Sequence, residues 1–153
     1  MATNRHSEKR SPRVEGDPSP RGRGAPEAPG RVRATAATRQ RRARQIIASL
    51  RRREGVPGAD LRSMWLCFWN LSGIDLRQVD FRSANLSHAN LRGSDLRGAD
   101  LRSSTLTGAN LRGAQLEDAA LSDALVKGAD CKGVVGLGVQ QLEILRRGGA
   151  LVD

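Results

Sequence analysis

The chain has 153 residues, of which 26 are basic and 16 acidic, giving a net charge of +10. Its two cysteines and two histidines lack the spacing of metal ligands, which argues against a zinc site. No segment is long and apolar enough to span a bilayer, and the N-terminus has no apolar signal-peptide core, so we expect a cytoplasmic protein without a transmembrane segment.

The positive charge is concentrated in the N-terminal part of the chain. Residues 1–58 hold 15 basic and 5 acidic side chains, whereas residues 59–153 hold 11 of each. Residues 1–32 are also rich in Arg, Pro, Ser and Gly and poor in apolar residues. We therefore expect residues 1–32 to form a disordered basic tail.

Residues 33–54 have the pattern of a basic amphipathic helix. Ala43, Ile46, Ile47 and Leu50 recur at helical spacing, and residues 55–58 form a linker in which Gly55 and Pro57 would stop the helix. The apolar stripe can dock on the structure that follows, or the helix can bind nucleic acid or an acidic membrane surface. The candidate polyanion-binding residues are Arg39, Arg41, Arg42, Arg44, Arg51, Arg52 and Arg53.

Residues 59–133 repeat with a period of five. Neither an α-helix nor a flat strand places every fifth residue on one face, so the chain must turn a corner in each unit. We predict an all-β solenoid in which this fifth residue and the small residue two places before it point inward. The predicted structural core is Leu61, Leu66, Leu71, Leu76, Phe81, Leu86, Leu91, Leu96, Leu101, Leu106, Leu111, Leu116, Leu121, Val126 and Cys131.

Units such as Ala89-Asn90-Leu91-Arg92-Gly93 resemble the pentapeptide-repeat family. The resemblance implies a right-handed quadrilateral β-helix with four units per coil, here about four coils. The residues support four sides independently, because Asp60, Asp80 and Asp100 are twenty apart. A glycine column of the same spacing (Gly73, Gly93, Gly113 and Gly133) suits corners that need positive φ.

Both ends of such a solenoid need covering. We expect residues 134–153 to form a C-terminal cap with a short helix from Val139 to Arg147. Its apolar stripe, with the residues before it, should close the last coil: Val134, Val135, Leu137, Val139, Leu142 and Leu145. An end-to-end homodimer through this end is the alternative to a monomer. At the other end, Trp69 is expected to pack as part of a cap.

One of the four sides, here called the uncharged side, lacks charge until Lys127 and carries aromatic residues. The candidate partner-binding residues on this uncharged side are Trp65, Phe68, Asn85, Ser87, His88, Thr105, Thr107 and Leu125. Such a side is suited to a partner. The alternative is that the helix at residues 33–54 folds over Trp65 and Phe68 and hides them.

The sequence holds no catalytic constellation. His88 falls at a corner, Cys131 should be an interior residue, and Cys67 lies about 14 Å from it along the stack, too far for a disulfide. We expect no enzyme, no cofactor and no metal, but a non-catalytic interaction module with a protein partner. Nucleic-acid association through residues 1–54 is one alternative.

The family resemblance implies another alternative, a DNA-mimicking protein that binds DNA gyrase and protects it from quinolones. The repeat region departs from that pattern because it is neutral overall. It carries seven arginines where a mimic needs anionic charge: Arg62, Arg77, Arg82, Arg92, Arg97, Arg102 and Arg112.

Overall fold

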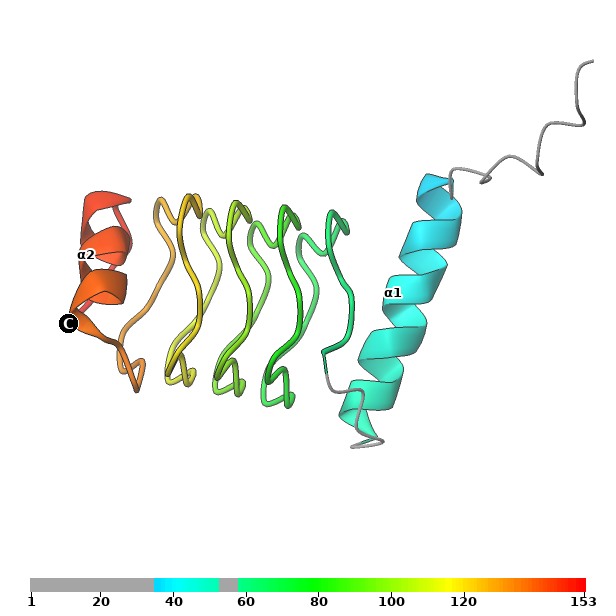
Figure 1. The fold of residues 1–153 in the computed structure, drawn as a ribbon, viewed down its shortest axis with the longest axis horizontal. Helices are drawn as coiled ribbons and strands as arrows, with labels where there is room; N and C mark the ends of the chain where they lie inside the picture. The colour runs from blue at the N-terminus through cyan, green and yellow to red at the C-terminus, as the bar shows by residue number, and fades with distance from the viewer. Residues whose placement is uncertain (1–34, 53–57) are drawn as a thin grey trace, which may run out of the picture. The chain divides into compact units, whose positions relative to one another are not determined.

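The computed structural model describes residues 35–52 and 58–153. The predicted tail at residues 1–32, most of the linker at 55–58, and Arg53 lie outside these residues. Helix α1 spans Ala36–Arg51 and helix α2 spans Val139–Arg147. Between the two helices, the chain winds into stacked coils, each made of short extended segments joined by tight corners (Figure 1).

Parallel β-bridges join residues that are twenty apart, from Asp60 with Asp80 to Gln115 with Val135. Each unit contributes only one bridging residue, because a corner follows within three residues. Twenty residues per turn are four units of five, so the coil has four sides. Neighbouring coils are held by regular backbone hydrogen bonds, as where the Leu61 N–H donates to the Asp80 carbonyl at 2.9 Å.

The interior of the coil follows the predicted register. All fifteen every-fifth residues from Leu61 to Cys131 are at most 2% exposed. Most of the small residues two places before them are buried as well, including Ser94 and Ser104. These two hydroxyls donate to the Leu91 and Leu101 carbonyls at 2.7 Å, so the interior serines have partners.

The corners impose a left-handed backbone on every unit. The residue two places after each interior leucine has a φ between 54° and 68° in all fifteen units, and eight of these residues are not glycine. The sequence predicted this geometry for the glycine column only. The structure extends it to bulky side chains such as Phe68, Gln78 and His88.

Helix α1 covers the open end of the first coil. The Thr35 Oγ1 caps its N-terminus by accepting from the Thr38 N–H at 3.2 Å. Ala43, Ile47 and Leu50 are at most 7% exposed and belong to one apolar core with the interior residues, against which Trp69 also packs. The apolar stripe therefore docks on the solenoid.

Side chains of α1 also satisfy the unpaired edge of the first coil. The Gln40 Nε2 donates to the Trp65 carbonyl at 2.8 Å, and the Arg51 guanidinium donates to the Asn70 carbonyl. In later coils the corresponding carbonyls accept from the backbone of the preceding coil, as Asn85 O does from Leu66 N–H. The helix thus supplies donors that no preceding coil provides.

Helix α2 closes the other end, but with a different set of residues from the predicted stripe. Leu145 is fully buried, and Leu137 and Ile144 pack partly against the core. The predicted roles of Val135 and Val139 are wrong, since these residues are 57% and 84% exposed. Val135 holds the outward bridging position of its unit, and Val139 is the first residue of α2, facing away from the coil.

After α2 the chain returns to the stack. Leu151 bridges Asp130, with the Leu151 N–H donating to Ala129 O and the Cys131 N–H donating to Leu151 O, both at 2.8 Å. The offset here is 21 residues instead of twenty. The last bridging residue of this side is therefore supplied from beyond the cap helix.

Candidate functional site

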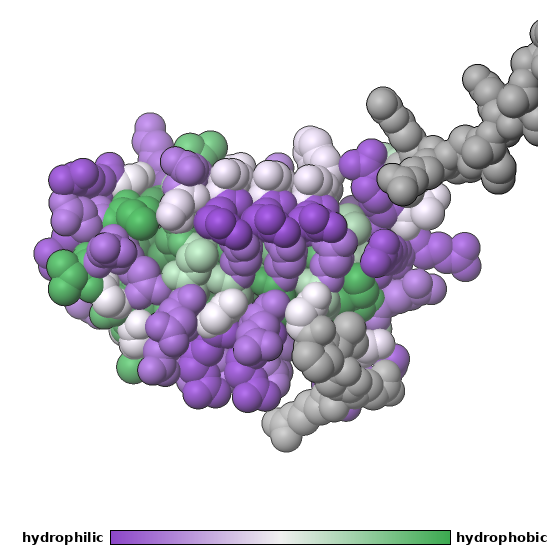
Figure 2. All heavy atoms as spheres, in the orientation of Figure 1, coloured by the Kyte–Doolittle hydropathy of each residue, from purple (hydrophilic) through white to green (hydrophobic). Residues whose placement is uncertain are grey.

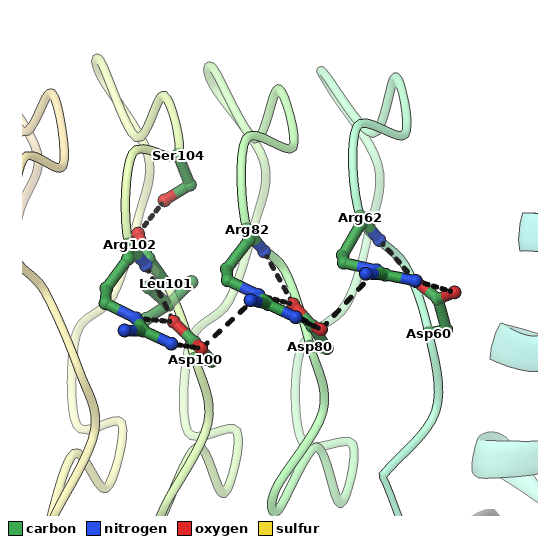
Figure 3. A network of polar contacts seen from close by, with 8 residues as sticks. All are labelled: Asp60, Arg62, Asp80, Arg82, Asp100, Leu101, Arg102 and Ser104. Atoms are coloured by element: carbon green, nitrogen blue, oxygen red, sulfur yellow. Dashed lines mark hydrogen bonds and ion pairs between the residues drawn. The ribbon is translucent and has the colours of Figure 1, made fainter.

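The side that contains Leu61 carries a continuous ladder of carboxylates and guanidinium groups (Figure 3). Arg82 pairs with Asp80 of its own unit at 2.7 Å and with Asp100 of the next coil at 3.5 Å. The hydrogen bond from Arg82 lowers the pKa of Asp80. The Asp80 Oδ1 also accepts the backbone N–H of Arg82 at 3.1 Å, which fixes the turn.

The side containing Leu76 pairs its charges in a similar way, whereas the side containing Leu71 holds one ion pair among its described residues. Arg77 lies 2.7 Å from Asp75 and 3.7 Å from Asp95, and Arg112 lies 3.3 Å from Asp130. Figure 2 shows hydrophilic side chains in regular rows that cross the stacked coils on the face in view. On the sides containing Leu61 and Leu76, opposite charges offset one another at short range.

The remaining side brings the predicted partner-binding residues together. Parallel bridges link Trp65 to Asn85, Asn85 to Thr105 and Thr105 to Leu125 in one column. The side chains of Trp65, Phe68 and Leu125 are 66%, 76% and 61% exposed. The interpretation in which α1 hides Trp65 and Phe68 is therefore wrong, because α1 lies on the open end of the coil and bonds to Trp65 through its backbone carbonyl.

Phe68 and His88 form a stacked pair at one corner of the uncharged side. Their ring centroids are 5.2 Å apart and the rings are within 10° of parallel. A Cβ added to Gly108, in the next coil, would lie 2.6 Å from the His88 ring, so the imidazole rests against the backbone of that glycine. The twenty-residue spacing of these three corner positions was the available sequence signal for this stack.

The arginines proposed for polyanion binding lie on α1. All those within the described residues are exposed: Arg39, Arg41, Arg42, Arg44, Arg51 and Arg52. Arg51 bonds to the first coil, and Arg42 adds a small electrostatic contribution to the lowered pKa of Asp60, which is due mainly to its hydrogen bond with Arg62.

Within residues 35–52 and 58–153, no group of three or more His, Cys, Asp or Glu side chains could hold a metal ion. Cys131 is buried, and burial raises the pKa of its thiol to about 11, which disfavours the nucleophilic thiolate. No helix in the described part of the chain is long and apolar enough to cross a membrane.

Sequence comparison identifies the repeat. The family described as "Pentapeptide repeats" matches in eight copies, over residues 66–98, 84–123 and 94–133. No curated protein sequence matches the chain.

Solved structures of pentapeptide repeat proteins are similar to parts of the chain. Rfr23 from the cyanobacterium Cyanothece 51142 is 37% identical over 50% of this chain and 52% of its own, with a TM-score of 0.47. The protein alr5209 from Nostoc Pcc 7120 is 29% identical over 69% of this chain and 94% of its own, with a TM-score of 0.32. QnrB1, a plasmid-mediated fluoroquinolone resistance protein, is 27% identical over 50% of this chain and 53% of its own, with a TM-score of 0.34.

The match to Rfr23 spans about half the length of that structure. The eight repeat copies fall on the residues whose five-residue register and twenty-residue bridges build the coil. Residues 66–133 of this chain are therefore similar to the pentapeptide-repeat family.

Proposed function

We propose that this protein is a non-catalytic interaction module whose solenoid presents its uncharged side to a protein partner. The observation that carries the proposal is the exposure of Trp65 and Phe68 on the side that has no charged residue before Lys127. Tryptophan and other aromatic residues are enriched at protein interfaces and dominate their binding energy.

The energetics of the four sides favour the uncharged one. Covering an Asp–Arg ladder would take ionised groups out of water, which costs several kcal/mol per ion before new partners form. The uncharged side offers hydroxyl, amide and aromatic groups, as in Thr105, Asn85 and Trp65, whose desolvation costs less. A partner therefore loses less free energy in covering this side.

The exposed ring of Phe68 gives further support. Its φ of 63° is shared by the other corners of the coil, so this backbone conformation is a demand of the fold and does not single Phe68 out. Its aromatic side chain is 76% exposed at that corner, where a partner can cover it.

The test is affinity capture with the full chain and the double variant Trp65→Ala, Phe68→Ser. We expect the variant to retain at least tenfold less of a partner protein that the unmodified chain captures. Its melting temperature should be unchanged. Val139→Ala is the control, because it removes another apolar side chain that is 84% exposed, from the start of α2. Retention of the same proteins by the double variant, or a melting temperature lowered by several degrees, would contradict the proposal.

The DNA-mimic alternative is not favoured by the charge arrangement. A mimic of the duplex needs negative charge spread along its surface, at one charge per about 1.7 Å of the axis. Here Asp80 and Asp95 each lie within 4 Å of arginines of two successive coils. The carboxylates are thereby neutralised at short range on the sides that would imitate the phosphates.

A further inference from the structure

Docking on the solenoid uses only one face of α1. The buried residues Ala43, Ile47 and Leu50 form the inner stripe, while Arg41 and Arg44 are exposed. At 100° per residue, Arg41 projects nearly opposite this stripe and Arg44 projects to its flank. The two interpretations of the helix are therefore compatible, since capping leaves a basic face directed to solvent.

We propose that this outer face of α1, which carries Arg41 at its centre and Arg44 at its edge, binds the phosphate backbone of a nucleic acid. The sequence of α1 contains no acidic residue over all of Ala36–Arg51. This contrasts with the solenoid, where arginines such as Arg82 and Arg97 are paired with aspartates. Guanidinium groups match phosphate geometry through two parallel hydrogen bonds.

The face is held in place before any ligand arrives. The buried stripe and the bonds from Gln40 and Arg51 to the first coil fix the helix at two points along its length. From Arg41 to Arg51 the helix rises about 15 Å, a length over which a duplex presents about nine phosphates. A preorganised row of cations binds without the entropic cost of ordering a free segment.

A membrane surface suits this helix less well. Helices that lie on membranes insert an apolar face among the acyl chains. The large apolar residues of α1 are already buried in the core or packed against it, and the outer face offers only alanines such as Ala37. Electrostatic attraction to phosphates is therefore the interaction left to the outer face.

The experiment measures binding of the full chain to a fluorescent 20-base-pair DNA duplex and to a 20-nucleotide single strand, between 50 and 200 mM salt. The test variant is Arg41→Ala, Arg44→Ala, since alanine preserves helix propensity. Each phosphate contact contributes about 0.9 to the slope of log K against log salt. We expect the slope of the variant to be shallower by about 2, so that the unmodified chain loses about tenfold more affinity over this range.

The matched control is Arg92→Ala, Lys132→Ala, which removes two exposed positive charges from the solenoid. We expect its slope to stay that of the unmodified chain, and circular dichroism should show the same helix content in all three proteins. The proposal is overturned if both double variants behave alike. It is also overturned if the full chain binds vesicles with 30% phosphatidylserine but binds neither the duplex nor the single strand. Comparison of the duplex with the single strand identifies which phosphate backbone is preferred. Trp65→Ala, Phe68→Ser should leave this binding intact, so the proposed protein interface and this site can fail separately.

Discussion

The corner residue is where the fold places its strictest demand on a single amino acid. Every corner has a φ near 60°. Glycine adopts this conformation without strain, whereas the Cβ of any other residue comes too close to the backbone carbonyl. Gly93 isolates this effect, because a Cβ there would have no atom within 4 Å. Any loss of stability caused by a side chain at Gly93 therefore comes from the backbone conformation and not from steric clashes with neighbouring atoms.

We expect Gly93→Ala to lower the free energy of unfolding by about 1 kcal/mol, because the native φ of 61° is unfavourable for alanine. Urea denaturation checks this value. Gly108→Ala should cost more, since its Cβ would lie 2.6 Å from the His88 ring. Equal stability of Gly93→Ala and the unmodified chain would show that the corner tolerates side chains freely.

The inward and outward positions of single residues were predictable from the sequence, whereas their contacts were not. A period of five assigns Leu61 and Phe81 to the interior because only a corner in each unit puts them on one axis. The stacking of Phe68 on His88 depends on the rotamers of both rings and on the space left by Gly108. The sequence pattern carries no information on those rotamers.

At the scale of elements, the two helices act as caps that satisfy both the apolar core and the backbone edge. In α2, Gln141 links the helix to the stack. Its Oε1 accepts from the Gly138 N–H at 2.6 Å, and its Nε2 donates to the Leu116 and Ala119 carbonyls at 2.8 and 2.7 Å. One side chain thus caps the helix and the last coil together.

Gln141→Ala should therefore destabilise the protein by about 1–2 kcal/mol, through the loss of a helix cap and of donors to edge carbonyls. Gln140→Ala is the matched control, because Gln140 is exposed. Differential scanning calorimetry of the two variants compares them directly. A melting temperature of Gln141→Ala equal to that of Gln140→Ala would refute this role.

The cap could be predicted as a helix from periodicity, but its orientation could not. Val139, Leu142 and Leu145 share a stripe on the isolated helix, yet only Leu145 is fully buried. The contacts of Gln141 with the last coil and the return of the chain at Leu151 determine which face of α2 packs against the coil. Both are three-dimensional constraints with no local sequence signature.

At the scale of the whole molecule, the ladders couple stability to pH. Hydrogen bonds from the neighbouring arginines lower the pKa of Asp60, Asp75, Asp80, Asp95 and Asp100 below the ordinary 3.8. A carboxylate whose pKa is lower in the folded than in the unfolded protein stabilises the fold at any pH above the unfolded-state pKa. That stabilisation is lost as the pH falls through the folded pKa.

We expect the free energy of unfolding to be constant from pH 7 to about 5 and to decrease below about pH 4. Asp80→Asn should reduce this decrease, because an asparagine still accepts the backbone N–H two residues on, as Asn90 does from Arg92 at 3.2 Å, but carries no charge. Urea titrations at pH 6 and pH 3 measure the difference. An acid sensitivity of Asp80→Asn identical to that of the unmodified chain would contradict a contribution from this ladder.

The offset of twenty residues between bridged positions also determines how this protein could change length. Insertion of a single five-residue unit would preserve the leucine core but rotate every later unit by one quarter turn. Later units of the Leu61 side would then follow the uncharged side, and later units of the amide side containing Leu71 would follow the carboxylate side containing Leu76. One ladder and the continuous uncharged side would therefore be broken. Insertion or deletion of twenty residues would keep each column on its own side. Gene duplication can therefore lengthen or shorten the molecule without mixing its surfaces only in whole coils.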